Sequence, residues 1–184
     1  MKTYVFLANG FEIVEATLPI DIMRRAKIDV VTVSTTGQKI VTASNGVQIV
    51  ADQLLGECDQ LDGEMIFMPG GMPGSSNLSD CAPLAELINA YAEADKWLVA
   101  VCAAPLVYGR MGLLNGYNAT CYPGFEPELL GANTQKKTVV RDGKRITGCG
   151  PGACFALGRA MVAALIDEST ADAILGQMMF QVYE

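Results

Sequence analysis

The chain has 184 residues, of which 51% are hydrophobic and 18% are charged, and this composition is typical of a globular protein with a full core. Its net charge of −7 argues against a nucleic-acid or anionic-membrane partner, because both require a basic surface. No apolar stretch is long enough to span a bilayer, and the apolar N-terminal run meets Asn9-Gly10 without a cleavage-site pattern, so we expect a cytoplasmic protein with no membrane partner.

Strand and helix patterns alternate along the chain, which predicts an α/β fold with a mostly parallel sheet. The first half is expected to hold strands and one helix, with a hairpin around residues 44–46, in the order strand 2–8, helix 12–27, strand 29–34, paired strands 39–42 and 47–51, and strand 64–68. The second half is expected to hold helix 83–94, strand 97–101, helix 103–114, a hairpin of 138–141 with 144–147, and helices 152–165 and 169–180. No linker or repeat interrupts the pattern, so we expect one domain over residues 1–184.

Cys102 lies between the buried strand 97–101 and the helix expected from residue 103. A sulfur at such a corner is close to the positive end of a helix dipole and to unpaired backbone N–H groups. This environment can lower the pKa of a thiol from about 8.5 to between about 3.5 and 7.5. The position alone also fits a buried cysteine that serves as a small hydrophobic residue.

The chain contains no histidine, which removes the commonest metal ligand and every Cys-His or Ser-His-Asp arrangement within one chain. Six cysteines are present without a C-x-x-C pair, at positions 58, 81, 102, 121, 149 and 154. A dinucleotide-like pattern spans Gly148 to Ala153, but no strand follows its helix to close the βαβ unit. We therefore expect neither a metal nor a cofactor.

Three polar or glycine-rich segments follow predicted parallel strands, and ligands of open α/β sheets bind at those strand ends. If the strands are parallel there, residues 9–15, 69–74 and 102–105 converge on one crevice. Glu15 would raise the thiol pKa when ionised and lower it when protonated, although acids also favour the first turn of any helix. The N–H groups after Gly70 and Cys102 could hold an oxyanion, and a tight turn without a ligand is the alternative.

Four motifs occur in register, and together they resemble the ThiJ/PfpI superfamily, most closely the branch that contains the Parkinson-associated protein deglycase. They are Gly10-x-Glu12-x-x-Glu15, Met68-Pro69-Gly70-Gly71, Ala100-Val101-Cys102-Ala103-Ala104-Pro105 and Gly150-Pro151-Gly152. The resemblance implies a flavodoxin-like three-layer sandwich with helices on both faces, and a homodimer. It also implies that Cys102 is the nucleophile, that Glu15 is a protonated carboxyl bonded to its sulfur, and that the N–H groups of Gly71 and Ala103 surround an oxyanion.

The chain departs from the family pattern at Tyr122, where many members have a histidine, and at Cys149, where an arginine is usual. A tyrosine is a poor base at neutral pH because its pKa lies near 10, so the protease activity ascribed to some members is disfavoured here. The leading prediction is a glyoxalase-like or deglycase-like enzyme acting on a small carbonyl or glycated substrate, with Tyr122 and Gly70 lining its pocket. A redox sensor or chaperone with an oxidisable Cys102 is the main alternative, and a protease or a thiazole- or thiamine-biosynthesis protein is a weaker one.

Overall fold

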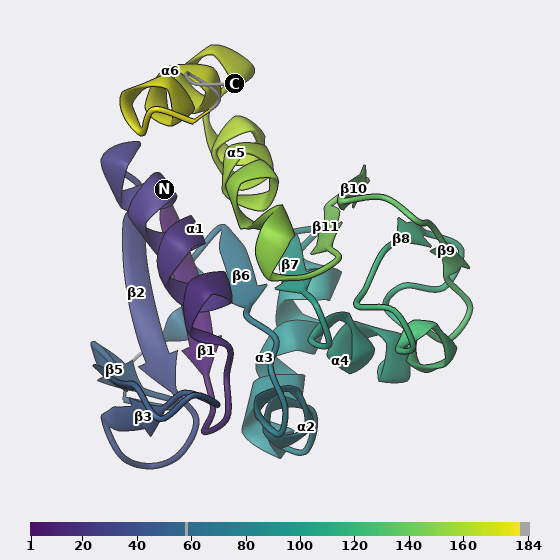
Figure 1. Ribbon diagram of the computed structural model, residues 1–184. Helices are drawn as coiled ribbons and strands as arrows, with labels where there is room; N and C mark the ends of the chain where they lie inside the picture. Colours follow the sequence, from purple (N-terminus) through teal and green to yellow (C-terminus); the bar gives the residue numbers. More distant parts are fainter. Residues whose placement is uncertain (58, 181–184) are drawn as a thin grey trace.

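The computed structural model of the chain describes residues 1–57 and 59–180 and is built on a seven-stranded sheet (Figure 1). The strand order is β10-β11-β7-β6-β1-β2-β5, and every neighbouring pair is parallel except β10 with β11. The strands span Lys2–Leu7 (β1), Asp29–Ser34 (β2), Gln53–Leu54 (β5), Met65–Met68 (β6), Trp97–Val101 (β7), Val139–Asp142 (β10) and Arg145–Gly148 (β11). The strands β6 and β7 are buried along their whole length, as continuous apolar runs in a sheet covered on both faces must be.

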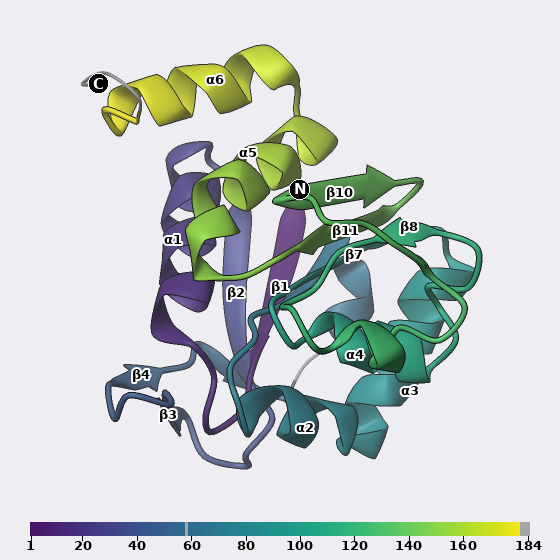
Figure 2. The ribbon, with the colours of Figure 1, turned by 45° about the vertical axis from the view of Figure 1, so that its right-hand side comes forward.

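Helices cover both faces of this sheet (Figures 1 and 2). One face carries α1 (Ile13–Arg25) and α5 (Cys154–Leu165), with α6 (Glu168–Gln177) packed on α5. The other carries α2 (Gly74–Ser79), α3 (Ala82–Glu93) and α4 (Pro105–Arg110). Alternate residues of β1 enter the two cores, Val5 on the α1 side and Tyr4 on the α3 side. The fold is therefore the flavodoxin-like three-layer α/β sandwich that the sequence predicted.

Smaller elements complete the fold outside the central sheet. Two short pairs of strands lie there, β3 (Ile40–Thr42) with β4 (Gln48–Val50) and β8 (Asn118–Ala119) with β9 (Asn133–Thr134). The described residues also form the 3-10 turns η1 (Gln60–Asp62), η2 (Glu126–Glu128) and η3 (Pro151–Ala153). Both predicted hairpins are confirmed, as β3–β4 and as β10–β11.

The helix predicted over residues 103–114 is wrong at both ends, because α4 runs only from Pro105 to Arg110. Residues 102–104 form the corner itself, and the backbone turns away again near Gly112, whose φ is +73°. The helix predicted from residue 152 instead begins as the turn η3 before α5. Within the described ranges, no helix has the length and apolar character needed to cross a membrane.

Candidate functional site

Three loops meet at the carboxyl ends of the neighbouring strands β1, β6 and β7 (Figure 1). The Glu12 N–H donates to the Gly70 carbonyl at 2.9 Å, and the Gly74 N–H donates to the Gly10 carbonyl at 3.2 Å. The strand β1 has β2 on one side and β6 on the other, so this edge is the point where the strand order reverses. Ligands of open α/β sheets bind at such points. The contacts among the loops confirm the predicted convergence of residues 9–15, 69–74 and 102–105.

Cys102 occupies a strained corner immediately after β7. Its φ is +63°, a left-handed conformation that costs a non-glycine residue about 1–3 kcal/mol and needs surrounding contacts to hold it. Two backbone hydrogen bonds supply them: the Cys102 N–H donates to the Gly148 carbonyl at 2.9 Å, and its carbonyl accepts from the Tyr122 N–H at 2.8 Å. Cys102 as a whole is half-buried.

Glu15 is fully buried in the first turn of α1. Glu12 caps this helix, accepting the Glu15 N–H at 2.7 Å, and the Gly70 N–H donates to Glu15 Oε2 at 2.8 Å. Burial raises the pKa of Glu15 to about 7, and the opposing effects of the Cys102 thiol and the Gly70 N–H are smaller. Glu15 is therefore a carboxyl that can both give and accept a proton near neutral pH.

Only glycine fits at positions 70 and 71. A Cβ on Gly70 would lie 2.6 Å from Cys102 Cβ and 2.7 Å from Glu15 Oε2. Gly71 has a φ of +89°, and a Cβ there would lie 2.5 Å from the Glu12 nitrogen. The absence of these two side chains lets the β6 loop lie directly against the cysteine and the carboxyl.

The predicted lowering of the Cys102 pKa is wrong when Glu15 is ionised. Burial and the negative charge of Glu15 raise the pKa of the thiol to about 12, and they outweigh the lowering by the N–H groups of Gly71 and Ala103. With its proton on the carboxyl, Glu15 no longer repels a thiolate and can donate to it. The two groups therefore titrate as a coupled pair, in which the protonation of Glu15 changes the pKa of the Cys102 thiol.

Tyr122 is 47% exposed and adjoins the cysteine through its backbone. A Cβ on Gly150 would lie 3.4 Å from Tyr122 Cδ2, so the ring borders the Gly150 turn. Sequence reasoning gave no role to Cys154, yet its buried thiol donates weakly to the Gly150 carbonyl at 3.9 Å, and its pKa is raised by burial and by Glu15. No group of histidine, cysteine or carboxylate side chains that could hold a metal occurs in the described part of the chain, and Cys58 lies outside it.

A family model described as "DJ-1/PfpI family" matches residues 1–164. The chain belongs to the DJ-1/PfpI family. It is 34% identical over 182 residues to Protein DJ-1 homolog B of Arabidopsis thaliana, covering 98% of this chain but only 42% of that protein. It is 33% identical over 153 residues to Protein dj-1beta of Drosophila melanogaster, covering 82% of each. The solved structure of oxidized DJ-1 from Toxoplasma gondii superposes with a TM-score of 0.94 at 30% identity, covering 98% of both chains.

The predicted family is thus confirmed, and the chain spans less than half the length of the Arabidopsis relative. Of the residues predicted for the site, Cys102, Glu15, Gly70, Gly71 and Ala103 lie together around the sulfur. Tyr122 lies at the margin, with its backbone rather than a basic side chain next to the cysteine.

Proposed function

We propose that the chain is a cysteine-dependent enzyme that acts on small reactive carbonyl compounds or on glycated substrates. The observation that carries the proposal is the buried carboxyl of Glu15, with a pKa near 7, beside a cysteine in a strained corner. A general acid–base group works best when its pKa lies near the working pH. Membership of the DJ-1/PfpI family supports the same site.

The proposed reaction begins when the Cys102 sulfur attacks an aldehyde carbon and the Glu15 carboxylate takes the thiol proton. The carbonyl π bond becomes an oxyanion, for which the N–H groups of Gly71 and Ala103 are the proposed donors. Glu15 returns its proton to this oxygen, which gives a hemithioacetal. With a 2-oxoaldehyde such as methylglyoxal, the Glu15 carboxylate then carries the proton of the former aldehyde carbon to the neighbouring carbon, and the hemithioacetal hydroxyl proton passes to the ketone oxygen. The former aldehyde carbon becomes a thioester, the ketone is reduced to an alcohol, and water releases a 2-hydroxy acid.

A redox-sensing or chaperone role is the second candidate. Peroxide would convert a Cys102 thiolate to a sulfenic acid with loss of hydroxide, and the same N–H groups would stabilise the added oxygen. The half-buried position of Cys102 favours this candidate, as does similarity to a protein whose solved structure is of its oxidized form. A peptidase is disfavoured because the chain has no histidine, so neither it nor a second copy could supply one. Nothing in the site favours thiazole or thiamine biosynthesis.

We also infer that the chain acts in the cytoplasm as a homodimer. Three apolar side chains, Ile40, Val47 and Val50, are 49–69% exposed on and beside the β3–β4 hairpin, and Val14 is exposed on the adjoining end of α1. Apolar side chains left exposed on neighbouring elements would be covered in an interface between subunits. Light scattering of the parent and of Val50→Asp tests this inference, since the substitution would release monomers.

The enzyme proposal is tested by following 2-hydroxy acid formation from methylglyoxal in the parent, Cys102→Ser and Glu15→Gln. We expect Cys102→Ser to abolish turnover and Glu15→Gln to reduce it by about 10²–10⁴-fold, the usual contribution of general acid–base catalysis. Cys81→Ser is the matched control, because this thiol lies beside α3 and away from the site. Full turnover in Cys102→Ser, or none in the parent, would refute the proposal.

A further inference from the structure

A hollow lies on the α3 side of the sheet and shares no residue with the Cys102 site. It is a groove of about 800 Å³, a volume within the range of small-molecule sites. Ser34 and Thr35 line it at the carboxyl end of β2, and Leu55 lines it directly after β5. The groove therefore opens at the carboxyl ends of two parallel strands, where α/β sheets present ligand sites.

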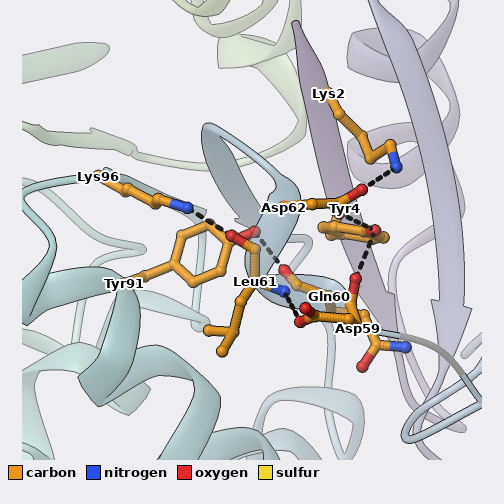
Figure 3. A network of polar contacts seen from close by, with 8 residues as sticks. All are labelled: Lys2, Tyr4, Asp59, Gln60, Leu61, Asp62, Tyr91 and Lys96. Atoms are coloured by element: carbon orange, nitrogen blue, oxygen red, sulfur yellow. Dashed lines mark hydrogen bonds and ion pairs between the residues drawn. The ribbon is translucent and has the colours of Figure 1, made fainter.

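The turn η1 forms one wall of the groove and is tied to elements on both sides (Figure 3). The Tyr91 hydroxyl, on the buried side of α3, donates to the Gln60 carbonyl at 2.5 Å. The Tyr4 hydroxyl, from β1, donates to Asp62 Oδ1 at 2.6 Å. Contacts to both α3 and β1 fix the turn, so this wall is formed before any ligand arrives.

The lining of the groove combines apolar side chains with two carboxylates. Leu55, Leu61 and Leu87 provide apolar surface, while Asp59 on the η1 side and Glu86 on α3 provide negative charge. The Leu61 N–H donates to one carboxylate oxygen of Asp59 at 2.8 Å, which orients that side chain. Within the described residues, the groove lining contains no lysine or arginine, and Glu86 forms no ion pair there.

We propose that this groove binds a small free amine, a ligand with an apolar body and an ammonium group. The apolar body would displace water from the leucine surface, and the ammonium group would pair with a carboxylate of the lining. An anionic ligand of the same shape would meet the same surface and like charges, so charge complementarity selects the cation. The proposal is independent of the carbonyl chemistry proposed for Cys102.

The thiol of Cys81 lines the groove and is half-buried, so it can report occupancy without a change to the groove. The experiment measures the alkylation rate of Cys81 by mass spectrometry in a full-length Cys102→Ser protein, which removes the other site's reactive thiol. Phenethylamine is the cationic probe, and 3-phenylpropionate is the anionic probe of nearly the same shape. We expect phenethylamine to slow alkylation in a saturable manner below about 10 mM, and 3-phenylpropionate to have no effect.

Two variants locate the effect. Glu86→Gln is expected to weaken protection by phenethylamine about two- to fivefold, the effect of one partly exposed charge pair. Ala90→Trp fills the groove from α3 and is expected to abolish protection, with circular dichroism checking that it folds. Equal protection by the two probes, no protection by the amine, or an unchanged effect in Glu86→Gln would each overturn the proposal. None of these results depends on whether Cys102 turns over a carbonyl compound.

Discussion

Glu15→Gln is expected to stabilise the folded protein at alkaline pH, although it alters the proposed site. The pKa of Glu15 is about 7 in the folded protein and 4.5 in its ordinary environment, so the folded state holds this proton more tightly than the unfolded chain. The contribution of this proton to stability is complete below pH 4.5 and is lost as the pH rises through about 7. The difference in pKa corresponds to about 3 kcal/mol. A glutamine at this position has a neutral amide of the same shape, which does not titrate and so loses no stability as the pH rises.

The assay is urea unfolding between pH 4.5 and 8, made in a Cys102→Ser background so that the carboxyl titrates without its thiol partner. We expect the stability of Glu15→Gln relative to Glu15 to increase by about 3 kcal/mol over this range. Glu93→Gln, at an exposed position near the end of α3, controls for the removal of one surface charge. A difference between Glu15→Gln and its parent that stays constant with pH would refute the raised pKa and the burial argument behind it.

Three further predictions concern the packing around the site, the contact between α1 and α5, and the cap of α6. Gly70→Ala is expected to lower the alkylation rate of Cys102 at least about tenfold, because the new Cβ would lie only 2.6 Å from the Cys102 Cβ. Gly152→Ala is the control and is expected to leave the rate unchanged, since open space surrounds that position. Gly158→Ala is expected to lower the free energy of unfolding in urea by about 1–3 kcal/mol, because the new Cβ would lie 2.5 Å from Ile22 Cδ1 in the α1–α5 contact. Gly176→Ala, in open space on α6, is the control and is expected to be neutral or stabilising by up to about 1 kcal/mol. Asp167→Ala removes the cap of α6 and is expected to cost about 1 kcal/mol, and an equal melting temperature would contradict this.

The sequence predicted the layered fold because its signals are local. The continuous apolar runs of β6 and β7 indicate strands buried on both faces, and Asp142-Gly143 identifies the hairpin of β10 and β11. The order of motifs along the chain, together with the parallel sheet, also predicted that Glu15, Gly70 and Cys102 would meet. The short strand β5 was not predicted, because its two residues carry no periodic pattern.

The electrostatics of the site could not be predicted in the same way. The position of Cys102 before a helix suggested a lowered thiol pKa, but the pKa depends on how completely the packing removes water from the sulfur and from Glu15. The neighbourhood of Cys154 likewise depends on the packing of α1 against α5, which brings together residues about 140 positions apart in the chain. The groove beside α3 is lined from four separate segments and has no sequence motif.

The most direct test of the account is the alkylation rate of Cys102 against pH, resolved by mass spectrometry in the parent and in Glu15→Gln. Because burial and the ionised Glu15 both raise the thiol pKa, the account predicts an apparent pKa above about 8.5 in the parent, and a lower one in Glu15→Gln, where the negative charge is gone. An apparent pKa below about 8.5 in the parent, or one that stays the same or rises in Glu15→Gln, would contradict the account. In that case Glu15 would hold its proton beside a thiolate and could not act as the base in the proposed reaction.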